Sequence, residues 1–535
     1  MKTYLSSLVV VAFALLSFNA SATVRYVDLN CTNATPPYTG WSTAATNIQD
    51  AVDAATNGDL VLVTNGVYQT GGAGTGAFSI ESNRVAVTKP VTLQSVNGAA
   101  VTIIQAYQMP TNSGLNSLRC VWLTNGATLS GFTLMNGYAF SRLELNGGSG
   151  GGVYCLSNAT VSDCVIISNS AGSGGGAYGG SLIHCFLSQN SARLNGGGAV
   201  SSFIDNCTIT CNSAEAGGGA CVISSQIPKD PQGSWINNCV IAGNVASNGG
   251  GVSGCTLNNC ILSGNVATNI GGGAYLGVLN NCTVVGNSAS SGGGVGGSED
   301  VQYFPKPPVV AVIANNCIVY NNFASSCSNY FNAVFYNGCT TPLPTNGTGN
   351  ITNEPAFVDF VNGDFHLKSN SACINSGNNS YVTNLADLDG NPRISGGTVD
   401  IGAYEFQNPS SVISYAWLQQ YGLLTDGSAD YVDSDVPAGD GLNNYQEWMA
   451  GTNPTNAASV LKMTSAVPTN NLAGMVVTWQ SVTNRTYFLQ RSVNLAAQPA
   501  FSTIQNNIVG HTNTTSYLDT TATNSSQYFY RIGVQ

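Results

Sequence analysis

The stretch GGGAYLGVLNNCTVVGN, residues 271–287, combines the three features that decide the fold. A glycine triplet opens the stretch, Cys282 lies in a strand-like run, and Asn287 follows five residues after that cysteine. The same order returns along the chain, with the triplets starting 21 to 32 residues apart. The triplets are residues 150–152, 174–176, 196–198, 217–219, 249–251, 271–273 and 292–294.

Each repeat contributes one cysteine and, in most repeats, one asparagine at a fixed position. The cysteines are Cys164, Cys185, Cys207, Cys239, Cys260, Cys282 and Cys317. Five residues after the first six of them lie Asn169, Asn190, Asn212, Asn244, Asn265 and Asn287. Prolines in two longer intervals, around residues 226–234 and 299–310, predict surface loops at those places.

Three adjacent glycines in every unit exclude a helical repeat, because each glycine costs about 1 kcal/mol inside a helix. A leucine-rich repeat has a similar length, but these units lack its leucine-bearing convex segment. The repeat therefore predicts an all-β fold, a right-handed parallel β-helix whose equivalent residues stack about 4.8 Å apart. We expect cysteine, isoleucine and valine columns inside, asparagines hydrogen-bonded along the axis, and glycines at corners with positive φ.

The region before the first triplet has the pattern of the start of this solenoid. Residues 47–55 have the apolar spacing of an amphipathic helix, and Leu60 to Val63 form an expected buried strand. A helix at this place would cover the unpaired backbone groups of the first coil.

Two of these patterns resemble known families. Residues 41–55 and the Gly66-Val67-Tyr68 string resemble the entry to secreted bacterial β-helix proteins of the pectin-lyase-like superfamily. The glycine-triplet units with spaced asparagines resemble the repeats of polymorphic outer-membrane proteins. These resemblances imply that one β-helix occupies residues 23–407.

A third resemblance concerns the end of that region, residues 350–407. The strings are Ala372-Cys373-Ile374-Asn375-Ser376-Gly377, Asp387-Leu388-Asp389-Gly390-Asn391-Pro392-Arg393 and Val399-Asp400-Ile401-Gly402-Ala403-Tyr404-Glu405-Phe406. They are similar to the "choice-of-anchor Q" segment of such secreted proteins.

Composition and the N-terminus both indicate secretion. Only 8% of the 535 residues are charged and the net charge is -11, so the chain lacks the basic surface that nucleic-acid binding requires. Lys2, an apolar run over residues 8–18 and the string Ala20-Ser21-Ala22 predict a signal peptide over residues 1–22, cleaved after Ala22. No later segment is apolar for long enough to span a membrane, and we expect a monomer.

An acidic segment, residues 408–460, follows the predicted solenoid. Asp433, Asp435, Asp440 and Glu447 follow the order of ligands in a calcium loop, with Gly441 after the third carboxylate. Four residues stand between Asp435 and Asp440 where the loop pattern has one. The stretch resembles the calcium-binding segments of thrombospondin type 3 and dockerin repeats, which implies a structural Ca²⁺; the alternative is a solvated acidic linker.

Residues 461–535 change to alternating strands with asparagine-rich turns. This pattern predicts a small β-sandwich, and it resembles a fibronectin type III domain. Of the 16 cysteines, we expect the column members to be buried thiols, and Cys327 with Cys339 to be a better pair for a disulfide.

Three polar residues that precede the column cysteines of consecutive units form the best catalytic candidate. Asp163, His184 and Asp205 are expected at equivalent positions, stacked on one face, with Asn238, Asn259 and Asn281 continuing the column. A structural polar ladder is the alternative explanation. The paired carboxylates that polysaccharide-cleaving sites need do not recur in the repeats.

These patterns favour a secreted or cell-surface β-helix protein without catalysis, which acts in adhesion or binds extracellular polysaccharide or cell-surface glycans. Two alternatives stay open. The first is a polysaccharide lyase or glycoside hydrolase acting on acidic polysaccharide, and the second is a passive structural spacer.

Overall fold

The computed structural model describes residues 22–74, 81–106, 117–140, 148–223, 235–298, 311–423, 425, 433–469, 474–483, 485–523 and 527–535. The predicted signal peptide, apart from Ala22, and the two loops expected around residues 226–234 and 299–310 lie outside the described residues. The chain divides into two compact units, residues 1–203 and 204–535.

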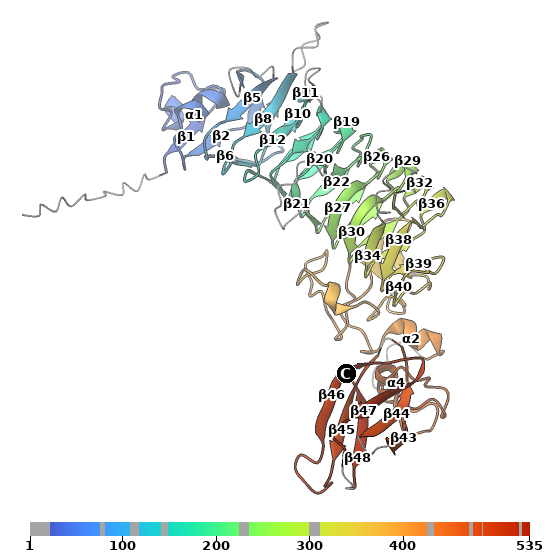
Figure 1. The fold of residues 1–535 in the computed structure, drawn as a ribbon. Helices are drawn as coiled ribbons and strands as arrows, with labels where there is room; N and C mark the ends of the chain where they lie inside the picture. The colour runs from blue at the N-terminus through green and yellow to red at the C-terminus, as the bar shows by residue number, and fades with distance from the viewer. Residues whose placement is uncertain are drawn as a thin grey trace, which may run out of the picture. The chain divides into compact units, whose positions relative to one another are not determined.

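The first unit is built from short parallel strands that pair in register with the next coil (Figure 1). Its first sheet column comprises β1 (Val24–Val27), β2 (Leu60–Val63), β6 (Thr92–Ser95), β9 (Thr128–Ser130), β13 (Thr160–Ser162) and β17 (Ser181–Ile183). Its second comprises β3 (Gly66–Tyr68), β7 (Thr102–Gln105), β10 (Thr133–Met135), β14 (Val165–Ile167) and β18 (Phe186–Ser188). Its third comprises β5 (Glu81–Val87), β8 (Ser117–Leu123), β12 (Val153–Cys155), β16 (Ala177–Tyr178) and β20 (Ala199–Val200).

Helix α1 (Ile48–Ala54) packs beside β1 and β5 in the first unit. The Asn47 side chain accepts a hydrogen bond from the backbone N–H of Asp50 and thereby caps the start of the helix. Ile48, Ala51 and Val52 are buried, so the apolar face of the helix lies against the first coils.

The second unit repeats the same coil. One sheet column holds β21 (Phe203–Asp205), β24 (Trp235–Asn237), β27 (Val252–Asn258), β30 (Ala274–Asn280), β34 (Val312–Asn315), β38 (Ala333–Tyr336) and β40 (Gly347–Thr348). A second holds β22 (Thr208–Thr210), β25 (Val240–Ala242), β28 (Ile261–Ser263), β31 (Thr283–Val285), β35 (Ile318–Tyr320) and β39 (Cys339–Thr340). A third holds β26 (Val245–Asn248), β29 (Val266–Ile270), β32 (Ser288–Ser291) and β36 (Phe323–Ser326).

The parallel β-helix predicted from the repeat is confirmed by these registers. All seven column cysteines are buried, with at most 3% of their surface exposed. The asparagine column is also buried, and in each unit its side chains bond along the axis. The Asn265 side-chain oxygen, for example, accepts from both the backbone N–H and the side-chain amide of Asn244, at 3.0 Å each.

The first glycine of each triplet lies at a corner with positive φ, from +56° to +70°. A Cβ on the second or third glycine would meet backbone oxygen of the neighbouring coil, at 2.3 to 2.7 Å for most of them. Glycine is therefore required both for the turn and for the close approach of one coil to the next.

All 16 cysteines are free thiols, so the predicted disulfide between Cys327 and Cys339 is wrong. Cys339 is buried in β39 and packs in the core of the second unit, whereas Cys327 is exposed at a corner with φ +55°. The two positions have different environments because one belongs to a strand and the other to a turn.

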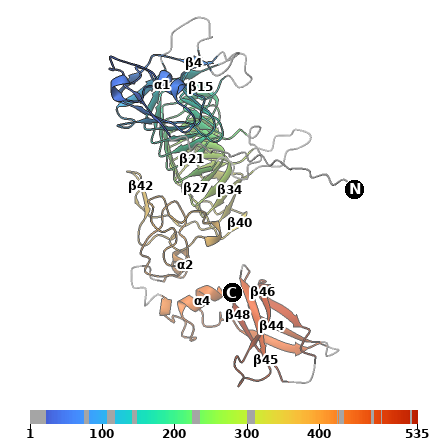
Figure 2. The same cartoon turned by 90° about the vertical axis from the view of Figure 1, so that its left-hand side faces the viewer.

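After the last coil the chain folds over its own solenoid. It forms the hairpin of β41 (Phe357–Asp359) and β42 (Asp364–Leu367) and then an irregular segment, residues 376–406, which we call the strap. Two short helices follow, α2 (Tyr415–Gln420) and α4 (Asn444–Ala450), as Figure 2 shows.

The C-terminal residues form two three-stranded antiparallel sheets, the β-sandwich predicted from the alternating pattern. One contains β43 (Met463–Pro468), β44 (Met475–Ser481) and β47 (Asn513–Asp519). The other contains β45 (Thr486–Ser492), β46 (Ser502–Val509) and β48 (Phe529–Val534). Val477 and Trp479 of the first sheet and Tyr487 and Leu489 of the second form the buried core.

Candidate functional site

Asp163 and His184 are brought together in the first unit. They directly follow β13 and β17, which pair in register, so the two residues lie one above the other. The Asp163 Oδ1 and His184 Nδ1 atoms are 3.7 Å apart, and about 60% of each side chain is exposed. They form an exposed polar pair on the surface of the solenoid.

Asp205 does not occupy the same position in the coil, and that prediction is wrong. It is the last residue of β21, paired with Asn237, and Asn206 stands between it and Cys207. Its carboxylate accepts hydrogen bonds from the side-chain amides of Asn206, at 2.8 Å, and Asn238, at 3.1 Å. The sequence pattern predicted Asp205 at the corner position that Asn206 occupies. The two residues before Cys207 are both polar, so the pattern did not separate the end of the strand from the corner.

The residue directly before the column cysteine has a left-handed backbone in every repeat. Asp163 and His184 have φ of +52° and +51°. In the second unit the equivalent residues are Asn206, Asn238, Asn259, Asn281 and Asn316, with φ from +49° to +52°. Aspartate, asparagine and histidine are the residues other than glycine that tolerate this conformation best. Backbone geometry alone therefore accounts for the residue types at Asp163 and His184.

In the second unit this asparagine column binds the strap. The side-chain amide of Asn316 donates to the carbonyl of Asn378 at 2.9 Å, and its oxygen accepts from the Asn378 N–H at 2.8 Å. Asn281 donates to the carbonyl of Tyr381 at 3.0 Å, and Asn259 donates to that of Ala386 at 2.8 Å.

The strap also covers the outer face of the sheet formed by β28, β31 and β35. Ile261, Val285 and Ile318 point outward from these strands, yet at most 4% of each is exposed because Ile401 and Ala403 pack in the same cluster. The outer face of this sheet is thus buried against the strap and is not exposed to solvent.

The equivalent outer face in the first unit carries no such cover among the described residues. It comprises Val67, Ile103, Gln105, Thr133, Met135, Val165, Ile167, Phe186 and Ser188, which we call the bare face. Val67 and Phe186 are each 41% exposed, and none of the nine residues is charged. Asp163 and His184 lie at its edge, two residues before Val165 and Phe186.

A buried charged cluster holds the strap together, and the sequence analysis assigned it no role. Asp387, Arg393, Asp400 and Glu405 are each at most 5% exposed. Backbone N–H groups of Asn375 and Phe406 donate to the Asp400 carboxylate at 2.7 Å each. Burial nevertheless raises the pKa of Asp400 to about 7 and that of Glu405 to about 8. All four residues lie in the strings of residues 387–393 and 399–406 quoted above, and their presence there was the sequence signal that could have indicated this cluster.

His366 on β42 links the hairpin to the strap. Its Nδ1 atom is 2.5 Å from Asp364 Oδ1, its Nε2 atom is 2.7 Å from Asp389 Oδ2, and its ring stacks on Tyr404. Burial opposes the positive charge, but the hydrogen bonds to the two carboxylates outweigh it and raise the pKa of His366.

The acidic junction brings together only part of the predicted calcium ligands. Asp433 Oδ1 accepts a hydrogen bond from the Ser411 hydroxyl at 2.5 Å, and Asp435 accepts from the Asn444 N–H through its backbone carbonyl. Glu447 is fully buried, and neither of its carboxylate oxygens has a hydrogen-bond partner. Asp440 Oδ2 is likewise buried without a partner.

Burial and then the neighbouring carboxylate of Asp440 raise the pKa of Glu447. Within the residues described, no three or more histidine, cysteine, aspartate or glutamate side chains gather as a metal site. The junction therefore supplies one close pair of acids, Asp440 and Glu447.

The fold and these sites define a parallel β-helix protein with a C-terminal sandwich. No protein-family model and no curated protein sequence matches the chain. Among solved structures, the pectate lyase Pel9A is 14% identical with a TM-score of 0.46, over 73% of this chain and 97% of that one.

Two further structures are similar at lower scores. A pectin methylesterase in complex with a hexasaccharide is 11% identical with a TM-score of 0.25, over 62% of this chain and 94% of that one. XylC in complex with xylose is 8% identical with a TM-score of 0.29, over 95% and 100%. Similarity at this level carries no conclusion about activity. No helix in the described part of the chain is long and apolar enough to cross a membrane.

Proposed function

We propose that the protein is a secreted glycan-binding protein and that its bare face binds an uncharged polysaccharide. The observation that carries this proposal is the composition of that face. Val67, Ile103, Thr133, Val165 and Phe186 form one column that is apolar except for the buried Thr133, and the amide of Gln105 stands beside it. A sugar chain presents both C–H faces and hydroxyl groups, and sites of this kind combine apolar surface with a few polar groups.

Charge selects between neutral and acidic glycans. The chain has a net charge of -11, and the bare face contains no lysine or arginine that could pair with a uronic acid. An acidic polysaccharide would be repelled by the field of the whole protein. The proposed ligand is therefore a neutral polysaccharide.

The test measures binding of the mature chain to neutral and to acidic polysaccharides by affinity electrophoresis or calorimetry. We expect Phe186→Ser to weaken binding of a neutral polysaccharide at least tenfold. Phe323→Ser is the matched control, because Phe323 is 64% exposed on β36 of the second unit. Equal loss in both variants, or preference for an acidic polysaccharide, would contradict the proposal.

A polysaccharide-cleaving enzyme is the second candidate, favoured by one observation. The exposed Asp163 and His184 pair flanks the bare face and could exchange a proton with a bound sugar. Release of reducing ends or unsaturated products that disappears in Asp163→Asn would establish catalysis. Binding without turnover supports the first proposal, and absence of both supports a passive spacer.

We also propose that Asp440 and Glu447 bind a structural Ca²⁺. Three buried carboxylate oxygens without hydrogen-bond donors support this, because a buried charge is stable only when it is paired. Oxygen ligands of this kind suit Ca²⁺, which takes further ligands from backbone carbonyls and water. The ion would remove the repulsion between the two acids and hold the start of α4.

Thermal unfolding with excess Ca²⁺ and with a chelator tests the calcium site. We expect a higher melting temperature with Ca²⁺, and no difference in Glu447→Gln or Asp440→Asn. Asp433→Asn is the control, because Asp433 is engaged with Ser411, and it should keep the difference. A parent protein that melts equally in both conditions excludes the site.

A further inference from the structure

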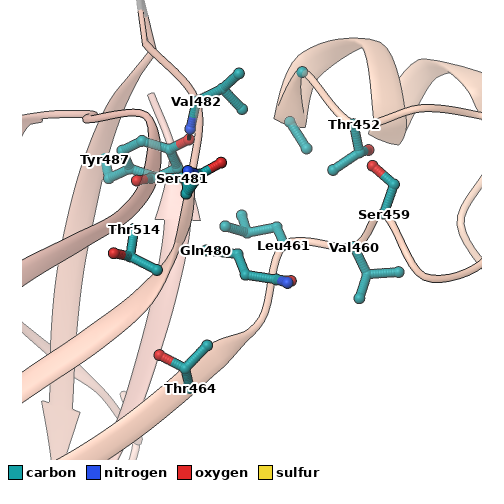
Figure 3. A pocket seen from close by; sticks show the side chains of 13 residues that line it. Thr452, Ser459, Val460, Leu461, Thr464, Gln480, Ser481, Val482, Tyr487 and Thr514 are labelled. Carbon is teal, nitrogen blue, oxygen red and sulfur yellow. Dashed lines mark hydrogen bonds between the residues drawn. The ribbon is translucent and has the colours of Figure 1, made fainter.

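The β-sandwich contains a cavity of about 410 Å³, which lies between β44 and the chain that follows α4 (Figure 3). Ala450, Gly451 and Thr452 at the end of α4 form one wall, and Ser459 to Leu461 continue it. Gln480, Ser481 and Val482 line the opposite side. The volume lies within the range of small-molecule sites.

The charge and polarity of the lining indicate the kind of ligand. None of the lining residues is charged. Val460, Leu461 and Val482 supply apolar surface, and Figure 3 shows them around the same space as Gln480 and Thr464. The cavity therefore suits an uncharged molecule with both apolar and hydroxyl surfaces.

Gln480 contributes a buried side-chain oxygen that has no hydrogen-bond donor. Its side-chain oxygen is buried and accepts no hydrogen bond, although a buried acceptor is normally satisfied. Thr514 lies directly opposite Gln480 on the neighbouring strand β47 and also lines the cavity. Both residues thus contribute polar side chains to the lining of the cavity.

Three other polar groups of the lining are engaged within the protein. The Ser481 hydroxyl donates to the His511 carbonyl at 2.8 Å, and the Thr464 hydroxyl donates to the Thr478 carbonyl at 3.1 Å. The Tyr487 hydroxyl accepts from the Val482 N–H at 2.9 Å. These bonds hold the wall in place, and the buried Gln480 oxygen is an acceptor that a ligand can use.

We propose that this cavity binds an uncharged sugar ring, with a sugar hydroxyl donating to the Gln480 oxygen. The C–H face of the ring packs on Val460, Leu461 and Val482, and a second hydroxyl bonds to Thr514. This inference adds a second site to the proposed glycan binding, separate from the bare face. The proposed cavity site rests on the proposed glycan-binding function only in its choice of a sugar as the ligand.

The experiment measures saturation transfer and calorimetric binding of neutral disaccharides, namely maltose, cellobiose and lactose, with galacturonic acid as the charged comparison. The full mature chain is used. We expect at least one neutral disaccharide to bind and galacturonic acid not to bind. Gln480→Leu, which removes the amide acceptor and keeps an uncharged side chain, should weaken binding at least tenfold.

Gln505→Leu is the matched control, because Gln505 is exposed on β46 outside the cavity, and it should bind as the parent does. Thr514→Val is a second variant in case Gln480→Leu does not fold, which a melting curve reports. Unchanged affinity in both cavity variants, or no binding of any neutral disaccharide by the parent, overturns the inference.

The two sites fail in different ways. If Phe186→Ser weakens polysaccharide binding while no disaccharide binds, the bare face is retained and the cavity is not a sugar site. If disaccharides bind through Gln480 and polysaccharide binding ignores Phe186, the cavity is retained and the bare face is not.

Discussion

The second column of strands has the same interior in both units but a different exterior. In the second unit the outer residues Ile261, Val285 and Ile318 are at most 4% exposed beneath the strap. In the first unit the corresponding column ends in Phe186, which is 41% exposed. The inward columns are set by the repeat, whereas the outer positions are free to differ. The difference shows that the repeat fixes the inward columns but not whether the rest of the chain covers the outer one.

The largest expected effect separates the covered face from the bare one. Ile401→Ala should lower the free energy of unfolding by about 4 kcal/mol, since Ile401 is fully buried and its loss leaves a cavity. Phe186→Ala should cost less than about 1 kcal/mol, because the side chain is partly exposed already. Urea unfolding of both variants measures the contrast, and equal losses would show that the bare face is also covered.

The second effect should be the same in both units, because the asparagine ladder belongs to the interior. Asn265→Ala leaves two donors of Asn244 without an acceptor and should cost about 3 kcal/mol. Asn190→Ala does the same to Asn169 in the first unit. Denaturant unfolding that shows a loss in only one unit would contradict a shared interior.

The third effect is a difference between the two units in how their stability depends on pH. Asp400 and Glu405 have folded pKa values of about 7 and 8, above the values of 3.8 and 4.5 for free carboxyl groups. The folded strap thus binds more protons than the unfolded chain, so its stability is complete below about pH 4 and falls as pH rises through 8. Between pH 5 and 8 we therefore expect the free energy of unfolding to fall, which denaturant unfolding at a series of pH values measures.

Asp59 in the first unit should change stability with pH in the opposite direction. Burial would raise its pKa, but hydrogen bonds from Thr56, Thr23 and Arg25 outweigh burial and lower it. Its contribution is present at neutral pH and is lost as pH falls through the folded pKa. Hydrogen exchange should show the strap opening first in alkali and the β1–β2 region opening first in acid. Asp400→Asn should reduce the alkaline effect and leave the acid effect unchanged.

The smallest effect concerns the left-handed corners. His184→Ala should cost about 1 kcal/mol, the penalty of alanine in that conformation. Asn281→Ala carries the same backbone penalty and also loses two hydrogen bonds, one to the Tyr381 carbonyl and one from the Asn316 amide, so it should cost at least about 1 kcal/mol more. Thermal melts of the two variants with His184→Asn as a neutral control measure this difference. Equal costs would mean that neither bond of the Asn281 side chain contributes to stability.

Much of the fold was predictable from the sequence, because a fixed period forces equal residues into equal places. Cys282 and Asn287 recur at constant spacing, and both columns are buried as the repeat predicts. Asp205 was misplaced because a polar residue stands at two adjacent positions before Cys207, and spacing alone does not tell a strand end from a corner. The pairing of Cys327 with Cys339 failed because separation along the chain says nothing about burial.

Little of the candidate sites was predictable. Asp440 and Glu447 keep their calcium-loop spacing and lie close together, but Asp433 turns to Ser411, a contact 22 residues away in sequence. Gln480 and Thr514 belong to strands separated by most of the sandwich, and only their pairing places them at one cavity. No short motif contains such pairs.

The sequence by itself determined the coil, because stacking of a repeat requires only that each unit have the same length and the same inward residues. Only the tertiary structure decided which outer surface is covered and which charges are buried. The strap has no period, and its docking depends on contacts such as Asn316 with Asn378 that form between distant segments. Those contacts are selected by shape and hydrogen bonding in three dimensions, which local spacing along the chain does not encode.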